Sequence, residues 1–434
     1  MKRSTLILII IFFAVFSINA QNPIPKKPRI LISTDIGGTD ADDNQSMAHL
    51  LMYNEMFDIE GVVSSPSFGN GSKEEILRMI DLYEKDYPKL KEHVKTLKTP
   101  NELRALCKQG RRGNVPIWGY EKPTEGSDWI VKCARKKCSD PLWVLVWGGI
   151  EDIAQALHDA PDIQSNIRVY WIGGPNKKWS VNAYAYIAEN FPNLWIIENN
   201  ASYRGFIHDS KKTDKFNTMY YDKCILGAGN LGKDFKNYYD GFVKMGDTPS
   251  LLYMMDGNPE DPTKESWGGS FEKMTESPRI IFTRNTTLKD TVPVYAVMEF
   301  RFKGPEIKKE VGTKCFVFTI AKQNWDGYYL GNGIYGVNYS PKAPESLSYE
   351  ITSDIKELNG LSGAFVVGKH WPGKHIASSY KLGDNWYTDK SDPNLFKGKW
   401  QGFKTTEKWR EAVLTDWEKR WNWLKVPGNR SSQK

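Results

Sequence analysis

The sequence predicts an α/β fold, with a mostly parallel sheet flanked by helices and a β-rich insertion or subdomain. Two observations carry this prediction. Between residues 28 and 253, short apolar runs rich in β-branched residues alternate with segments of helical periodicity, which indicates right-handed βαβ units. Between residues 278 and 385, apolar runs are separated by Gly, Asn and Pro turns, which is typical of antiparallel strands.

The elements of the first region follow from this alternation. Strands are expected at 30–34, 59–64, 142–147, 167–172 and 194–198. Helices are expected at 43–55, 73–85, 151–159 and 182–190. Ligands of such sheets lie beyond the carboxyl ends of the strands, so we expect the functional site at that edge.

The second region and the C-terminus complete the expected organisation. Strands are expected at 292–302, 315–320 and 363–367, and a helix at 405–423. The apolar residues of that helix recur about every four positions, which favours a packed face over a sugar platform; they are Trp409, Val413, Trp417 and Trp421. The expected divisions are a signal peptide at 1–20, an α/β domain at 21–277, the β-rich insertion at 278–385, a C-terminal helical segment at 386–424 that packs back on the α/β domain, and a tail at 425–434.

The N-terminus has the pattern of a cleavable secretory signal. Lys2 and Arg3 precede an apolar run at 6–16, and small or polar residues follow up to Ala20. The run is shorter than the roughly 20 residues that a membrane span needs. We therefore expect an exported protein, periplasmic or secreted, without a membrane anchor.

Charge and aromatic content narrow the class of ligand. The formal net charge is +7, but basic and acidic residues are interspersed without a basic stripe, so nucleic-acid binding is not supported. Sixteen Trp and twenty-one Tyr exceed what a core requires. Because aromatic faces stack on sugars, this content favours a carbohydrate ligand, although most of the rings are expected to be structural.

Cysteine usage does not indicate a disulfide scaffold. Five cysteines allow at most two bridges, and the best local candidate pairs Cys133 with Cys138 across a short basic turn.

The most informative segment follows the first expected strand. It holds Asp35, Asp40, Asp42 and Asp43, with a turn at Gly37 and Gly38 and a helix from Asp43 onward. Carboxylates packed this closely repel one another unless a cation or a network of donors compensates them, and a hard divalent metal is the simplest partner. The alternative is a solvated acidic turn that caps the helix.

The same segment resembles a known family. Residues 33–39, Asp42-Asp43, Gln45-Ser46-Met47 and residues 57–61 are similar to the nucleoside hydrolase-like domain of cellulose-binding proteins, a relative within the inosine/uridine-preferring nucleoside hydrolase superfamily. The likeness extends over residues 28–275 and returns at 400–424, with Trp409-Arg410, Asp416, Arg420 and Trp423. It implies a nucleoside hydrolase-like α/β fold.

The resemblance implies a Ca²⁺ site and its ligands. They would be Asp35, Asp43, the carbonyl of Glu151 and Asp247. For Asp247, an N-cap of the helix that starts at Pro249 is an equally good interpretation of the sequence.

The resemblance also implies residues that bind the sugar. Asp42, Asn70 and Asn182 are similar to the acid and amides that hold the family's ribose, although Asn70-Gly71 is also an ordinary turn. From its position, Arg204 meets a substrate group or stabilises a loop. Asp35 and Asp42 are the expected catalytic residues.

Two departures from the family matter for function. Gly246 stands where nucleoside hydrolases carry the His that protonates the leaving base, and Ser180 replaces a Glu. The leaving-group acid is therefore unidentified; the candidates are Glu151, Asp40, His208 and His49.

The leading hypothesis is an exported Ca²⁺-dependent glycoside hydrolase that cleaves an N- or O-glycosidic bond of a glycan fragment. The aspartates would bind metal, water and sugar hydroxyls, and Asp35 would be the base. A non-catalytic carbohydrate-binding protein is the alternative, and a nucleoside hydrolase with a repositioned acid is the third possibility. The partner is thus a carbohydrate or nucleoside-like small molecule, and the sequence does not determine the oligomeric state.

Overall fold

A computed structural model describes residues 27–207 and 216–425. The predicted signal peptide, His208 and residues 426–434 lie outside this part of the chain. Within it, no helix is long and apolar enough to cross a bilayer.

The first sheet is parallel except at one edge, as predicted. Its strand order is β3-β2-β1-β4-β5-β6-β18-β7, and only β7 pairs antiparallel to its neighbour. The strands are β1 (Arg29–Thr34), β2 (Asp58–Ser64), β3 (Cys107–Gln109), β4 (Leu142–Val146), β5 (Ile167–Ile172), β6 (Trp195–Asn199), β7 (Phe271–Lys273) and β18 (Trp386–Asp389). Every residue of β1, β4 and β6 is buried, which fits central strands covered on both faces.

Helices cover both faces of this sheet. They are α1 (Asp42–Met52), α2 (Lys73–His93), α3 (Pro100–Ala105), α4 (Glu125–Ala134), α5 (Glu151–Asp159), α6 (Gly174–Trp179), α7 (Val181–Asn190), α8 (Thr218–Tyr220), α9 (Gly229–Phe235), α10 (Thr248–Asp256), α11 (Lys404–Glu407) and α12 (Arg410–Leu424). Alternate side chains of β1 enter different cores: Leu31 packs with α4, α5 and α7, whereas Ile30 and Ile32 pack with α1, α2 and α12.

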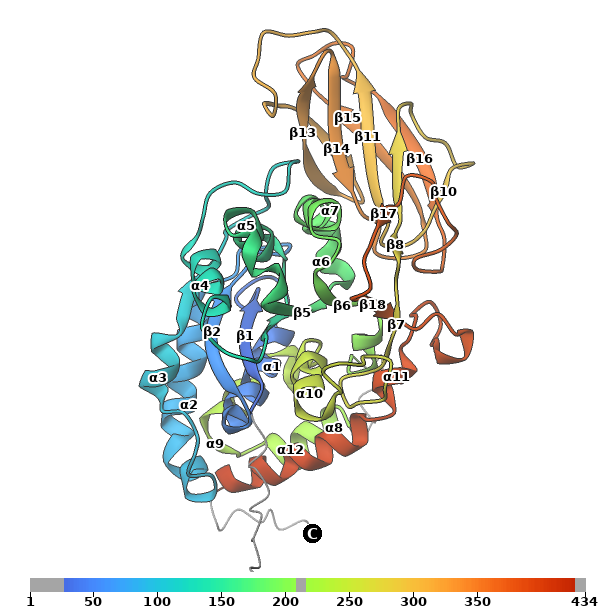
Figure 1. Cartoon of the computed structure of the whole chain (residues 1–434). Coiled ribbons are helices and arrows are strands. Elements are labelled where there is room, and N and C mark those ends of the chain that lie inside the picture. Colours follow the sequence, from blue (N-terminus) through green and yellow to red (C-terminus); the bar gives the residue numbers. More distant parts are fainter. Residues whose placement is uncertain (1–26, 208–215, 426–434) are drawn as a thin grey trace, which may run out of the picture.

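The second sheet is mostly antiparallel and lies beyond α6 and α7 (Figure 1). Its order is β10-β16-β15-β12-β13-β14-β11-β9. The strands are β9 (Arg279–Phe282), β10 (Thr291–Val292), β11 (Val297–Lys303), β12 (Lys314–Ile320), β13 (Gln323–Gly331), β14 (Ile334–Tyr339), β15 (Ser346–Thr352) and β16 (Ser362–Val367). Two short strands, β8 (Glu276–Ser277) and β17 (Tyr380–Lys381), pair beside it. Its apolar side chains join the core on the α5 and α7 face, so the sheet is packed onto the α/β body.

Three details differ from the sequence prediction. The run 292–302 is two strands, because Pro293 cannot donate to a ladder and Tyr295 has a φ of 62°. The segment 386–424 begins with β18, which extends the parallel sheet beside β6 before the helices start. The Cys133–Cys138 bridge is not formed: both thiols are free, and Cys133 is a buried residue of α4 whereas Cys138 is exposed.

The tryptophans of α12 form a packed face, as predicted. Trp417 and Trp421 are fully buried in the core with Phe235, and the helix runs along the side of the molecule opposite the second sheet (Figure 1).

Candidate metal and sugar site

The acidic segment lies at the carboxyl end of β1, where α/β sheets place ligands. The amide of Gly38 donates to the carbonyl of Asp35 at 2.9 Å and closes a tight turn. Gly37 has a φ of 84°, and a Cβ there would lie 3.0 Å from Cβ of Ser72 on the neighbouring loop. The turn therefore requires glycine, and it brings the chain to the start of α1 at Asp42.

Three carboxylates converge at the start of α1. Asp42, Asp43 and Asp247 each offer an oxygen, and these oxygens all lie within 4.8 Å of one another; we call these three residues the acidic triad. Asp35 adjoins the triad, since its carboxyl group shares a hydrogen bond with Asp43. The structure thus brings four of the predicted site residues together from segments more than 200 positions apart in the sequence.

The triad is buried, and the burial has an electrostatic cost. Asp43 and Asp247 are each 3% exposed. Burial, followed by repulsion from neighbouring carboxylates, raises the pKa of Asp43 and Asp247 well above the usual range. Burial and the charge of Asp42 raise the pKa of Asp35 to about 7. These four carboxyl groups can all be ionised together only if a cation or a network of donors compensates their charge.

An orphaned oxygen shows that the site fits a cation. Oδ2 of Asp247 is buried and has no hydrogen-bond partner among the described residues. Asp247 is the N-cap residue of α10, but its side chain makes no capping hydrogen bond. The carboxylate of Asp247 therefore does not cap α10, and it faces Asp42 and Asp43 instead. All the converging ligands are oxygens, which suits a hard cation such as Ca²⁺.

Gln45 on α1 holds the segment that brings Asp247 to the triad. Its Oε1 accepts hydrogen bonds from the amides of Lys244 (2.7 Å) and Met245 (3.0 Å), and its Nε2 donates to the carbonyl of Phe242 (2.8 Å). Ser46 and Thr248 add a hydroxyl contact at 3.1 Å. The residues that follow Asp43 thus position the distant segment that carries Asp247.

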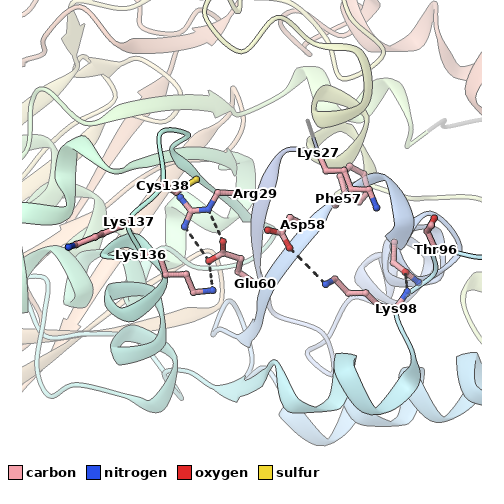
Figure 2. A pocket seen from close by; sticks show the side chains of 11 residues that line it. Lys27, Arg29, Phe57, Asp58, Glu60, Thr96, Lys98, Lys136, Lys137 and Cys138 are labelled. Carbon is pink, nitrogen blue, oxygen red and sulfur yellow. Dashed lines mark hydrogen bonds and ion pairs between the residues drawn. The ribbon is translucent and has the colours of Figure 1, made fainter. Parts of the chain in front are cut away.

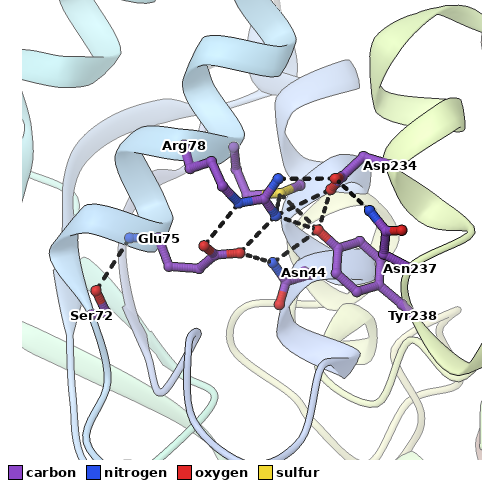
Figure 3. A network of polar contacts seen from close by, with 8 residues as sticks. Asn44, Ser72, Glu75, Arg78, Asp234, Asn237 and Tyr238 are labelled. Atoms are coloured by element: carbon purple, nitrogen blue, oxygen red, sulfur yellow. Dashed lines mark hydrogen bonds and ion pairs between the residues drawn. The ribbon is translucent and has the colours of Figure 1, made fainter.

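A polar network joins α1 to α2 and α9 (Figure 3). Asn44 donates to Glu75 on α2 (2.6 Å) and to the hydroxyl of Tyr238 (3.1 Å). Arg78 on α2 binds both Glu75 and Asp234 on α9. Because these bonds join α1, α2 and α9, Asp42 and Asp43 are held on a rigid support.

A second network joins the loops around Asp35. Asn176 on α6 donates to the carbonyls of Trp147 (2.8 Å) and Ile172 (3.0 Å) and accepts from Oγ of Ser67 (2.6 Å). Ser67 also bonds to Asp35. The loops after β1, β2, β4 and β5 therefore share one polar scaffold.

Among the described residues, the basic side chain of Lys244 lies beside the triad. Its Nζ binds Asp40 and lies 3.9 Å from Oδ2 of Asp42. Asp40 is thus engaged in an ion pair at the rim of the site. The sequence did not predict the roles of Lys244, Gln45, Ser67 and Asn176 at this site. For Ser67 and Asn176, a usable signal was their position just after expected strands.

Glu151 lies at the start of α5 with its side chain buried. Ser180 donates to its Oε2 at 2.9 Å, while Oε1 has no partner among the described residues. Burial raises the pKa of Glu151 to about 7. Its carboxyl group, and not only its carbonyl, is therefore a candidate functional group.

The other sugar-binding candidates have contacts outside the triad. Asn70 is exposed and lines a cavity toward the second sheet. The amide of Asn182 is engaged by the carbonyl of Val115 and the side chain of Asn338, both at 3.1 Å. Arg204 stacks on Trp400, with its guanidinium carbon 3.9 Å from the ring centre.

His49 has a structural role. It is buried against Tyr53 and Trp417, with ring centres 4.7 and 5.1 Å away, and burial lowers its pKa to about 3. A proton donor at neutral pH is therefore not available from this ring.

A separate cavity of about 520 Å³ lies at the edge of the first sheet opposite the acidic triad (Figure 2). It is lined by residues at the amino ends of β1 and β2, and its charges pair internally: Arg29 and Lys136 with Glu60, and Lys98 with Asp58. Because it lies at the amino ends of the strands and these charges are paired, this cavity is a weaker candidate for the functional site than the acidic triad.

Comparison with known families identifies the fold. The model of the family described as "Cellulose-binding Sde182, nucleoside hydrolase-like domain" matches residues 29–271. The chain belongs to the Sde182 nucleoside hydrolase-like family. The predicted family and fold class are thereby confirmed. A second model, a domain of unknown function (DUF5060), matches residues 291–354 in the second sheet.

The solved structures to which the chain is similar include nucleoside hydrolases. A nucleoside hydrolase-related protein from Saccharophagus degradans, described as associated with carbohydrate metabolism, is 17% identical over 79% of this chain and 100% of its own, with a TM-score of 0.49. An inosine-uridine preferring nucleoside hydrolase from Bacillus anthracis is 14% identical over 58% of this chain and 86% of its own, with a TM-score of 0.38. No curated protein matches the chain in sequence.

Proposed function

We propose that this protein is an exported, Ca²⁺-dependent glycoside hydrolase that acts on a glycan fragment. The convergence of Asp42, Asp43 and Asp247, whose Oδ2 has no partner among the described residues, carries this proposal, because binding of a sugar alone does not require three converging acids, two of them buried. The description of the family as cellulose-binding supports a carbohydrate ligand.

Asp35, Asp43 and Asp247 would hold the ion. A bound Ca²⁺ supplies positive charge that neutralises the carboxylates and polarises nearby oxygens. Asp42 is the most open member of the triad, with a side chain 13% exposed, and would accept hydrogen bonds from sugar hydroxyls.

Asp35 would act as the general base. Its raised pKa, about 7 without a metal, returns toward the usual value when a cation compensates the cluster, and it would then accept a proton from water. Ser67 orients Asp35 by hydrogen bonding to it. The water would attack the anomeric carbon as the glycosidic bond breaks.

The leaving group requires a separate acid. Glu151 is the strongest candidate, because its pKa of about 7 leaves a substantial fraction of it protonated near neutral pH and one of its oxygens has no partner among the described residues. Asp40 is paired with Lys244, and His49 is buried in the core.

Turnover of aryl glycosides and nucleosides, with and without EDTA, tests the proposal. Release of the aryl group that disappears with EDTA and in Asp43→Ala, but persists in Asp162→Ala at a distant surface, would support the hydrolase. Free base from inosine or uridine would favour a nucleoside hydrolase instead.

A non-catalytic carbohydrate-binding protein is the second candidate. Gly246 favours it, since no acid stands at the position where the resembled nucleoside hydrolases protonate a base. Saturable binding of a glycan without release of any product, by protein loaded with Ca²⁺, would establish this function.

A further inference from the structure

A cavity of about 410 Å³ separates the loop after β2 from the turn between β12 and β13. Phe68 and Asn70 line it from the α/β body, and Gln323, Asn324 and Trp325 line it from the second sheet. Its volume falls in the range of small-molecule sites, about 300–1,000 Å³. The cavity therefore draws its walls from both parts of the chain.

The lining has the chemistry of a sugar site. Phe68 is 50% exposed, and its ring centre lies 5.3 Å from that of Trp179, which also lines the cavity. Such rings offer apolar faces to the C–H groups of a sugar, while the amides of Asn70 and Asn324 can pair with hydroxyls. Lys322 is the one charged residue among those that line the cavity, so the lining suits a neutral ligand.

The wall from the second sheet is fixed in place. Nζ of Lys178, at the end of α6, donates to Oε1 of Gln323 and lies 5.0 Å from the ring centre of Trp325. Nearby, Asn338 on β14 donates to Asn182 on α7 at 3.1 Å. These bonds attach β13 and β14 to the helices and hold the cavity open without a ligand.

The cavity adjoins the Asp35 loop. Ser67 lines it and also bonds to Asp35. A Cβ on Gly69 would lie 3.6 Å from Cα of Gly38, so the loop after β2 packs on the turn that carries Asp35. One ligand of several units could therefore contact both places.

We propose that this cavity is a second saccharide subsite, which binds a further unit of a neutral oligosaccharide whose neighbouring unit lies at the acidic triad. The role of the triad rests on the proposed function, whereas sugar binding in the cavity does not. The substrate class is then an oligosaccharide, and the second sheet contributes directly to recognising it.

Calorimetric titration with cello-oligosaccharides of one to four units tests this subsite in Ca²⁺-loaded protein. Affinity should rise with chain length, and Phe68→Ala and Asn324→Ala should each weaken binding of the tetramer about five- to tenfold with little effect on the monomer. Leu288→Ala removes an equally apolar, 61% exposed side chain outside the lining and should change nothing. Because Phe68 is half exposed, its truncation should leave the circular dichroism spectrum unchanged.

The outcomes separate this inference from the proposed hydrolase. Equal affinity for monomer and tetramer, or unchanged tetramer binding by both cavity variants, would overturn the subsite even if hydrolysis is observed. Binding that increases with chain length and is lost in Phe68→Ala would support the subsite even if no glycoside is cleaved.

Discussion

Gly246 lies directly against Asp42: a Cβ at position 246 would come within 2.4 Å of Oδ2 of Asp42. This contact explains why the position is glycine in a chain whose resemblance is to enzymes with His there. A side chain would displace the most open carboxylate of the triad. Asp42 can therefore occupy its position only if residue 246 has no side chain, and a His there would displace it.

Gly246→Ala should weaken Ca²⁺ binding about 10–100-fold, because Asp42, which lies beside the proposed ligands of the ion, must move and takes its negative charge away from the site. Isothermal titration with Ca²⁺ measures this. Gly368→Ala, whose nearest atom is an ordinary 3.5 Å contact, is the matched control. Wild-type Ca²⁺ affinity in Gly246→Ala would contradict the role of this contact.

Asp247→Asn should raise the stability of the metal-free protein and abolish its stabilisation by Ca²⁺. The amide removes one buried charge from a group whose members repel, but it cannot supply the charge that the ion requires. Thermal unfolding with EDTA and with millimolar Ca²⁺ measures both effects. If the variant gained as much stability from Ca²⁺ as the wild type, Asp247 would not be a ligand.

Ca²⁺ binding should weaken as the pH falls from about 8 to 5. The pKa of Asp35 is raised to about 7 and those of Asp43 and Asp247 are raised well above their usual range, so protons compete with the ion. Without metal, the raised pKa values stabilise the folded state below the unfolded value near 4, and this contribution is lost as the pH rises through the folded values. Melting temperatures across this range should therefore fall with rising pH in EDTA and fall less in Ca²⁺.

Gln45→Ala should cost about 1–3 kcal/mol of stability, because the amides of Lys244 and Met245 lose their buried acceptor. Gln45→Glu keeps an acceptor for both amides and should recover part of the loss. Chemical denaturation and Ca²⁺ titration of both variants check this. A Gln45→Ala protein with unchanged stability and Ca²⁺ affinity would show that the 242–247 segment does not depend on this residue.

Much of the fold was predictable because its signals are local. The runs that became β1, β2, β4, β5 and β6 consist mostly of apolar residues, as is typical of central parallel strands. The tight grouping of acids after β1 is likewise visible in the sequence. By contrast, β18 has only four residues, and its place beside β6 depends on pairing with residues 190 positions earlier in the chain.

The sequence by itself determined the α/β class and the acidic segment from Asp35 to Asp43, since strand periodicity, turn glycines and clustered charge act over a few residues. Only the tertiary structure decided that Asp247 faces this segment, with one oxygen that has no partner in the described part of the chain, instead of capping α10. Only the packing of the second sheet on α6 and α7 placed Trp325 across a cavity from Phe68. Such long-range contacts depend on how whole elements bury their faces together, which local sequence patterns do not encode.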